Sequence, residues 1–170
     1  RWSPNGTKIA FISARRPDRE LVAHNEAYVM STTGGEPMAW SQDLFNVGAI
    51  AWSPEGERLV AVASDDPEIG ALAQGWLFIL EPREDPIRIT DDLMKPAAGF
   101  PPTIPAPLLC WTEANRIVFL ADSRGQSYLC QVPAQGGELR RITDGGMQLS
   151  DFTIDAKGER AVVLGASPTS

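Results

Sequence analysis

Few side chains in this sequence belong to the types that usually carry chemistry, and they lie far apart along the chain. There is one histidine, His24, and there are two cysteines, Cys110 and Cys130. Protein zinc sites are commonly built from three or four Cys and His ligands, so we expect no metal site and no cofactor. Nothing near His24 supplies a nucleophile for it to activate. We therefore expect His24 to be a solvent-exposed loop residue without a catalytic role.

The other candidates are charged residues in two polar stretches. Arg15 and Arg16 could attract the carboxylate of a substrate, whereas Asp65, Asp66 and Glu68 could hold the amine of a peptide. Charged side chains of this kind are more often simply solvated on the protein surface, so both interpretations stay open at these five positions. The elements on either side of the two stretches decide where the charges lie in space.

The composition indicates a folded, β-rich chain and argues against two classes of partner. The 170 residues are 43% hydrophobic and 22% charged, as in globular domains, and 15 Gly with 14 Pro suit short strands joined by turns. A net charge of −7 argues against binding nucleic acid, which requires a basic surface. No apolar run approaches the ~20 residues of a membrane-spanning helix. We therefore expect neither nucleic acid nor membrane as a partner.

A repeated motif organises the chain. Trp-Ser-Pro-x-Gly begins at Trp2 and again at Trp52, and weaker copies are centred on Trp111 and Ile154. The intervals are 50, 59 and 43 residues, a period in the range of β-propeller blades with connecting loops of variable length. The sequence opens inside the first copy, which predicts that it is a fragment of a longer protein.

Each copy of the motif leads into the same series of expected strands. One strand ends at the Trp position, a tight turn such as Ser-Pro-Glu-Gly follows, and the second strand is apolar nearly throughout. An aromatic-bearing third strand, a Gly-Gly turn and a short fourth strand complete the unit. Because stacked sheets bury both of their faces, the series predicts an all-β fold, a partial β-propeller of about three to four antiparallel four-stranded blades. In this single domain, 1–170, the predicted blades are 1–42 (incomplete), 49–90, 107–143 and 149–170 (incomplete).

The predicted strands also decide whether the two cysteines can pair. Cys110 falls on the first strand and Cys130 on the third strand of one blade. Strands lie ~4.8 Å apart, so the two residues should be roughly 9–10 Å apart, whereas a disulfide needs Cα atoms within ~7 Å. We expect two free, buried thiols and therefore a reducing compartment, with cytoplasmic localisation as the expectation.

The order of motifs resembles the propeller repeats of two groups, the periplasmic TolB-like proteins and the prolyl oligopeptidase family of serine peptidases. The shared pattern is Trp-Ser-Pro-x-Gly, an Ile-Ala-Phe strand, an aromatic strand, Gly-Gly-Glu and a final Ile-Thr. The stretch "LADSRGQSYLCQVPAQGGELRRIT" is most similar to the acylaminoacyl-peptidase and dipeptidyl aminopeptidase-like branch. The resemblance covers nearly the whole chain. It departs in the third turn, which reads Thr-Glu-Ala-Asn, and at Ile154, which stands in place of Trp.

In the peptidase family the propeller precedes a catalytic α/β-hydrolase domain that carries Gly-x-Ser-x-Gly, an acid and a histidine. This sequence has no Gly-x-Ser-x-Gly. The resemblance therefore implies a non-catalytic propeller segment, without catalytic residues, that gates or positions peptide substrates for a C-terminal α/β-hydrolase domain of the same parent chain. The long stretches 14–26, 65–74 and 91–107 would share one face of the ring and either meet that domain or line the substrate route.

Two other interpretations remain at this stage. One is a TolB-like protein-interaction propeller with no attached enzyme. The other is a lyase or glycosidase propeller, which would need paired carboxylates or a metal site that the sequence does not offer convincingly. In every case an incomplete propeller exposes sheet edges and blade faces, so we also expect self-association of the chain.

Overall fold

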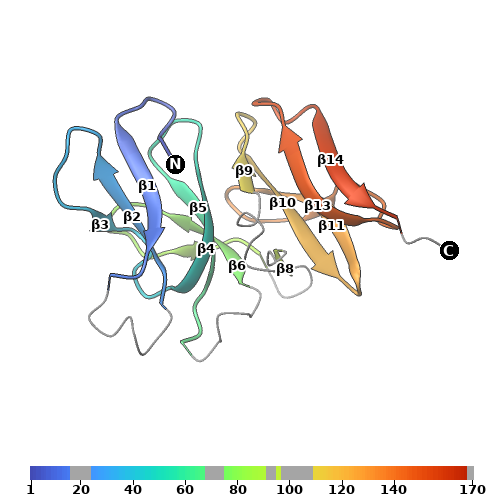
Figure 1. The fold of residues 1–170 in the computed structure, drawn as a ribbon, viewed down its shortest axis with the longest axis horizontal. Helices are drawn as coiled ribbons and strands as arrows, with labels where there is room; N and C mark the ends of the chain where they lie inside the picture. The colour runs from blue at the N-terminus through green and yellow to red at the C-terminus, as the bar shows by residue number, and fades with distance from the viewer. Residues whose placement is uncertain (16–23, 68–74, 91–94, 97–108, 168–170) are drawn as a thin grey trace.

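The chain folds as a row of antiparallel β-sheets (Figure 1) in a computed structural model that describes residues 1–15, 24–67, 75–90, 95–96 and 109–167. None of the described residues is helical, which confirms the all-β prediction, and the described part of the chain therefore offers no apolar helix that could cross a membrane. The strands are β1 Lys8–Ser13, β2 Glu26–Ser31, β3 Met38–Ala39, β4 Phe45–Trp52, β5 Leu59–Ser64, β6 Trp76–Leu80, β7 Ile87–Arg88, β8 Lys95–Pro96, β9 Leu109–Trp111, β10 Arg116–Ser123, β11 Gln126–Pro133, β12 Arg140–Arg141, β13 Gln148–Ile154 and β14 Ala161–Ala166.

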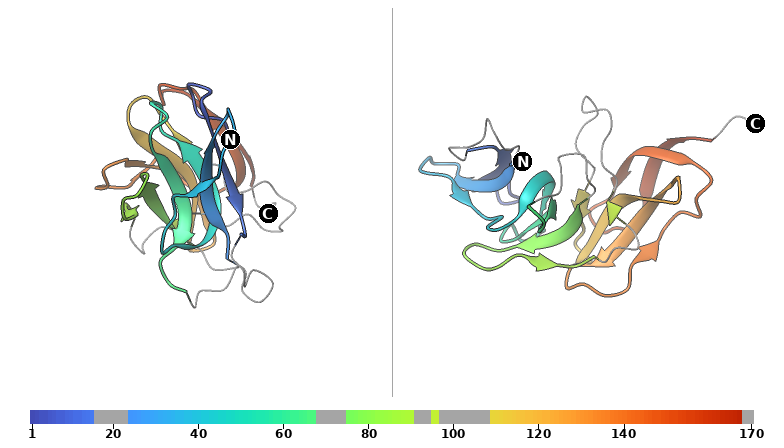
Figure 2. Two further views of the ribbon diagram at one scale, coloured as in Figure 1. Left: turned by 90° about the vertical axis from the view of Figure 1, so that its left-hand side faces the viewer. Right: turned by 90° about the horizontal axis from the view of Figure 1, so that it is seen from below.

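The strands form four sheets that follow one another along the chain. The first is β1-β2-β3, and a bridge between Trp2 and Ile9 marks the place of an inner strand. The second is β4-β5-β6-β7, the third is β12-β11-β10 with β8 and β9 both on β10, and the fourth is β13-β14. Successive strands are neighbours, as in a meander, and the sheets succeed one another from the blue to the red end of the molecule (Figures 1 and 2). This is the predicted arc of a β-propeller.

One strand had no counterpart in the predictions. β8 pairs Pro96 with Ala121 and Lys95 with Asp122, so it lies on the same edge of β10 as β9, farther along that strand. It precedes residue 107, where the third blade was expected to begin. A strand of two residues that includes a proline leaves no alternating pattern and shows no strand propensity, so sequence patterns cannot reveal it.

Apolar side chains fill the space between each pair of consecutive sheets. β5 is buried at all six positions, which explains why its sequence LVAVAS is apolar on both faces. One side of β5 packs toward the first sheet through Leu59 and Ala61, and the other side packs toward the third sheet through Val60 and Val62. A smaller cluster joins the third and fourth sheets through Leu120 and Phe152. Packing between blades therefore holds this fold together.

The residue after the Trp position is Ser, Thr or Asp in every unit, and its hydrogen bond explains this choice. In all four units its side-chain oxygen accepts a hydrogen bond from the backbone N–H at or just before the start of the second strand, which fixes the turn between the two strands. The donor and acceptor pairs are Lys8 and Ser3 (2.9 Å), Arg58 and Ser53 (3.0 Å), Arg116 and Thr112 (3.3 Å), and Arg160 and Asp155 (3.3 Å).

The last residue of each turn adopts a left-handed backbone. Gly6, Gly56 and Gly158 have φ values of 69°, 76° and 80°, a region in which glycine has no steric penalty. Asn115 takes the same place in the third unit with φ 57°, and Asn is among the few other residues that tolerate it. The departure Thr-Glu-Ala-Asn therefore preserves the geometry of the turn.

Candidate binding surface on the loop rim

The antiparallel pairing gives the arc two opposite rims. We call one the turn rim; it consists of the four turns 3–6, 53–56, 112–115 and 155–158. The other, the loop rim, lies where β1 ends opposite the start of β2 and where β5 ends near the start of β6. In the third sheet the same rim carries the short connection from Ser123 to Gln126.

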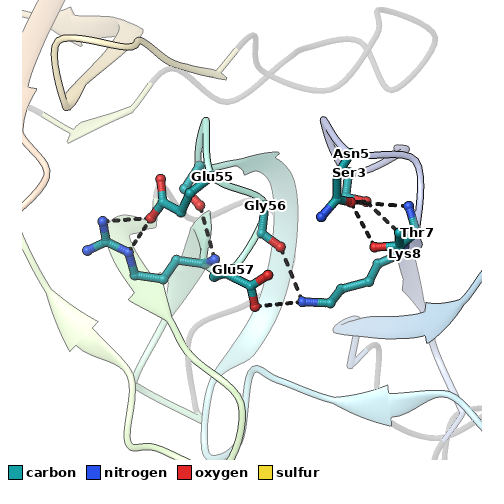
Figure 3. Close-up of polar contacts among 9 residues, drawn as sticks. Ser3, Asn5, Thr7, Lys8, Glu55, Gly56 and Glu57 are labelled. Atoms are coloured by element: carbon teal, nitrogen blue, oxygen red, sulfur yellow. Dashed lines mark hydrogen bonds and ion pairs between the residues drawn. The ribbon is translucent and has the colours of Figure 1, made fainter.

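The turn rim is filled by contacts within the protein (Figure 3). Lys8 Nζ lies 2.8 Å from Glu57 Oε2 and 3.3 Å from the carbonyl oxygen of Gly56, which joins the first sheet to the second. The Glu113 N–H donates to the carbonyl oxygen of Ala156 at 2.8 Å and joins the third sheet to the fourth. These contacts connect neighbouring blades, so the turn rim has a structural role.

Two of the three motif tryptophans, Trp52 and Trp111, lie between blades, as their fixed place in the repeat predicts, whereas Trp2 is 65% exposed and departs from that prediction. Trp52 is 7% exposed and Trp111 is 6% exposed. The ring of Trp52 meets the edge of Trp40 from the preceding blade at 5.7 Å between centroids, and the guanidinium of Arg58 lies 4.9 Å above the ring of Trp111. Each of these tryptophans therefore faces the preceding blade, and a cation–π contact adds to the burial of Trp111.

The predicted site residues divide between the described and the undescribed parts of the loop rim. Arg15 is exposed at the end of β1, with its guanidinium carbon 5.5 Å from the ring of Tyr28. Arg16 and Glu68 lie outside the described residues. Their role in binding stays a prediction.

The acidic candidates on the same rim are engaged within the second blade. Asp65 is exposed and lies 3.8 Å from a guanidinium nitrogen of Arg88, which follows on β7. The backbone N–H of Asp66 donates to Ser64 Oγ at 3.0 Å, so the chain turns sharply as it leaves β5. The contacts of Arg15 and of Asp65 are thus each made within one blade, although both present their charge on the same rim.

The prediction that His24 is solvent-exposed is wrong. The residue is half-buried, and its ring lies 4.7 Å from the ring of Phe45 at an angle of 53°. Its Nδ1 is buried and forms no hydrogen bond with the part of the chain that the structure describes. Phe45 comes from a different blade, so its contact with the loop before β2 could not be read from local sequence.

Two hollows lie along the inner strands of the sheets. One, of about 340 Å³, is lined by Arg1, Trp2, Ala51, Trp52, Leu109, Cys110 and Trp111. A second, of about 180 Å³, is lined by Arg1, Ala10, Phe11, Ile12, Ala49 and Ile50. The lining of the smaller hollow is mainly apolar and that of the larger one is mixed. The described residues contain no group of three or more His, Cys, Asp or Glu side chains that could hold a metal ion. Neither hollow offers an acid and base pair for chemistry.

The cysteines are free, as the strand assignment predicts. Cys110 is opposite Val118 and Cys130 is opposite Phe119 on β10. Consecutive residues of a strand point to opposite faces, so the two thiols are on different sides of the sheet. Burial raises the pKa of Cys130 to about 11, although the charge of Arg141 opposes the shift. Cys110 is only half-buried, which corrects the expectation of two buried thiols.

One signal in the sequence was missed. A basic residue stands six positions after the Trp position in three units, as Lys8, Arg58 and Arg160, and five positions after it as Arg116 in the shortened third unit. Lys8 and Arg58 make the contacts to the next blade described above. Alignment of the repeats would have identified this position as part of the interface between blades.

Comparison with known proteins supports the β-propeller arrangement of the sheets. No protein-family model matches the chain. A stretch of 64 residues, 38% of the chain, is 39% identical to the uncharacterized peptidase YuxL of Bacillus subtilis (strain 168), of which it covers 9%. The fold is similar to TolB from Acinetobacter baumannii (TM-score 0.70, 17% identity, 99% of this chain and 37% of that chain). It is also similar to a putative TolB from Agrobacterium tumefaciens (0.69, 17%, 98% and 53%) and to puromycin hydrolase (0.69, 17%, 99% and 25%).

These comparisons identify the type of fold, and one of them also points to a peptidase family. At 17% identity the solved structures show the fold alone, and the chain is a partial β-propeller whose fold is similar to that of the TolB structures. The sequence match to a peptidase then supports a propeller segment of a peptidase family, consistent with the resemblance to the prolyl oligopeptidase family. The chain spans less than a tenth of the matched peptidase and between a quarter and about half of the solved structures.

Proposed function

We propose that this propeller segment gates or positions peptide substrates for an α/β-hydrolase domain that belongs to the same parent protein. The observation that carries the proposal is the combination of a propeller arc with a stretch 39% identical to a peptidase. The likeness of the fold to a hydrolase, puromycin hydrolase, supports the same assignment. The free thiols favour a reducing compartment, so the proposal includes a cytoplasmic location.

The loop rim is the surface that we assign to the substrate or to the hydrolase domain. On the turn rim, an ion pair joins the first blade to the second and a backbone hydrogen bond joins the third to the fourth. On the loop rim, Arg15 and Asp65 expose charges of both signs at the ends of β1 and β5. Charges of both signs suit the carboxylate and the amine of a peptide, and connecting segments on a rigid scaffold are the usual location of binding residues.

The test uses the full-length parent protein and two peptide substrates of different size, with a folded protein of matching cleavage sequence as the third substrate. We expect covalent labelling by a fluorophosphonate, cleavage of both peptides and no cleavage of the folded protein. Charge reversals at Arg15 and Asp65 should raise the KM for peptides and leave kcat nearly unchanged. Reversal at Glu113 on the turn rim, which is also exposed, is the matched control and should leave KM unchanged.

A second candidate is an interaction propeller of the TolB type, which the likeness to two TolB structures favours. The two proposals differ in one measurement. A full-length protein that neither reacts with the fluorophosphonate nor cleaves peptides would support the interaction propeller. Labelling and cleavage with equal effects of loop-rim and turn-rim variants would retain the peptidase and reject the gating role of the loop rim.

A further inference from the structure

Arg88 on β7 contacts three separate segments of the chain on the loop-rim side of the second blade. Its guanidinium carbon lies 4.2 Å from the centre of the Trp76 ring. Its Nε donates a hydrogen bond to the carbonyl oxygen of Thr90 at 2.9 Å, and its Nη1 lies 3.8 Å from Asp65 Oδ2. One side chain therefore connects the chain that leaves β5, the start of β6 and the chain that leaves β7.

The pairing of the strands explains why these side chains meet. Ala63 pairs with Trp76, and Phe78 pairs with Arg88. Paired residues and alternate residues of one strand share a face of the sheet, so Trp76, Phe78 and Arg88 lie on the face that packs toward the first sheet. The second sheet lies between the first and the third sheets, so this face is internal to the arc.

The segments that this arginine contacts adjoin two of the long stretches on the loop rim. The stretch 65–74 begins at Asp65 and ends two residues before Trp76. The stretch 91–107 begins directly after Thr90. A guanidinium held against all three residues therefore fixes the entry and the exit of the first stretch and the entry of the second.

Two backbone amides report on the same part of the blade. The N–H of Asp66 donates to Ser64 Oγ at 3.0 Å, and the N–H of Leu77 donates to Thr90 Oγ1 at 2.9 Å. Each bond joins residues at or beside a contact of Arg88. Because local opening breaks such bonds before the whole domain unfolds, exchange of these two amides measures how firmly the ends of the stretches are held.

The third sheet contains an arginine at the same position. Arg141 occupies on β12 the place of Arg88 on β7, and both begin the sequence Arg-Ile-Thr. The guanidinium carbon of Arg141 lies 4.4 Å from the centre of the Tyr128 ring. In that sheet the second and third strands are joined by the short connection from Ser123 to Gln126. The contact between arginine and an aromatic ring is thus common to both sheets, whereas the two long stretches adjoin the second.

We propose that Arg88 is a positioning residue of the loop rim, which sets the place of Asp65 and of the chain after Thr90. The inference rests on the proposed function, because it concerns the surface that we assign to the peptide or to the hydrolase domain. A planar guanidinium suits this role, since it stacks on an indole ring while its N–H groups face a carbonyl oxygen and a carboxylate. Arg88 is exposed on an edge strand, so its removal should loosen the ends of both stretches and leave the blade folded.

The first experiment is amide hydrogen exchange of the 170-residue chain, read by nuclear magnetic resonance, for Arg88→Gln. We expect the amides of Asp66 and Leu77 to exchange about fivefold faster than in the unaltered chain, the size expected when a cation–π contact is lost. Circular dichroism checks that the variant is folded. Unchanged exchange at both amides would overturn the inference, because the ends would then be held without the arginine.

Arg141→Gln is the matched control for a general loss of stability. The amide equivalent to that of Leu77 in the third sheet belongs to Leu129, whose N–H donates to Thr143 Oγ1 at 3.0 Å. Arg141→Gln should leave Asp66 and Leu77 unchanged, and Arg88→Gln should leave Leu129 unchanged. Equal acceleration of Leu77 and Leu129 in Arg88→Gln would overturn the inference, since it would show that the whole chain is destabilised.

The second experiment measures peptide cleavage by the full-length parent protein. Arg88→Gln should raise the KM for peptides about fivefold with kcat nearly unchanged, and Arg141→Gln should leave both constants unchanged. A lower KM in Arg88→Gln would overturn the inference, because it would mean that Arg88 competes with the peptide amine for Asp65. An unchanged KM would overturn it as well. A parent protein without peptidase activity would reject the proposed function instead, and the exchange rates would still decide whether Arg88 positions the ends of the two stretches.

Discussion

The three tryptophans of the repeat allow the packing of the blades to be tested by one substitution at three places. Trp52 and Trp111 are 7% and 6% exposed, whereas Trp2, at the same position of its unit, is 65% exposed. We consider Trp→Ala at each position in turn. If these tryptophans stabilise the protein through burial between blades, the free energy of unfolding lost on substitution must depend on how buried each tryptophan is. It must then differ among the three positions, although the motif is present at each.

The magnitude follows from the buried area. A tryptophan buries 150–250 Å², and at ~25 cal/mol per Å² nearly complete burial corresponds to about 4–6 kcal/mol. This agrees with the ~3–5 kcal/mol typical of Trp→Ala in protein cores. Trp2 buries roughly a third as much, so its removal should cost ~1–2 kcal/mol. Trp52 also donates from Nε1 to the carbonyl oxygen of Arg1 at 3.1 Å, and Trp111 donates to Asn115 Oδ1 at 3.0 Å, so both costs should lie in the upper part of the range.

The assay is urea unfolding followed by far-ultraviolet circular dichroism, at a concentration low enough to keep the chain monomeric. Circular dichroism is preferred because each substitution removes one of the five tryptophans and so changes the fluorescence signal itself. We expect the unfolding midpoint to fall strongly for Trp52→Ala and Trp111→Ala and only slightly for Trp2→Ala, with similar m-values. Equal losses at all three positions, or a loss below ~1 kcal/mol at Trp52, would refute packing between blades as the basis of the motif.

Three further predictions address single contacts. In a double-mutant cycle, Lys8→Met and Glu57→Gln should show a coupling of less than ~1 kcal/mol that shrinks at high salt, because Glu57 is exposed and Lys8 is only partly buried; a coupling unaffected by salt would contradict this. Backbone hydrogen bonds, led by the N–H of Glu159, lower the pKa of Asp155 below its ordinary value of 3.8. The ionised carboxylate therefore stabilises the fold above that value and loses this contribution as pH falls through the lowered pKa. Asp155→Ala should accordingly flatten the fall of the melting temperature below about pH 4, and an unchanged slope would contradict the assignment. A pKa of about 11 should protect Cys130 from thiol reagents at pH 8 in the folded protein, and mass spectrometry should then find both cysteines reduced; a Cys110–Cys130 disulfide would show that the strand register is wrong.

The fold could be predicted from the sequence to the extent that it repeats. Each unit carries its own turn signals, such as Ser53 followed by a proline and the left-handed Gly56, and an apolar second strand such as β5. These are local features, and their recurrence at blade-like intervals supplies the tertiary arrangement. Strand β8 was not predicted, because a strand of two residues, one of them a proline, shows no periodic pattern in the sequence.

The binding surface could be predicted far less well, because its residues do not repeat. Arg15 and Asp65 were identified as charges, but the contacts of Arg15 with aromatic rings and of Asp65 with Arg88 depend on neighbouring strands. His24 is half-buried because Phe45 of the next blade covers it. No second copy of these segments exists in the chain for comparison, so nothing in the sequence fixes their three-dimensional partners.

The same repetition separates the effect of the motif from the effect of burial. Trp111 is 6% exposed and lies under the guanidinium of Arg58. Trp2 holds the equivalent position in the first unit but is 65% exposed. Trp2 and Trp52 share the sequence Trp-Ser-Pro-x-Gly and differ in burial, so a difference in the free energy lost on their substitution measures the packing between blades and not the motif itself.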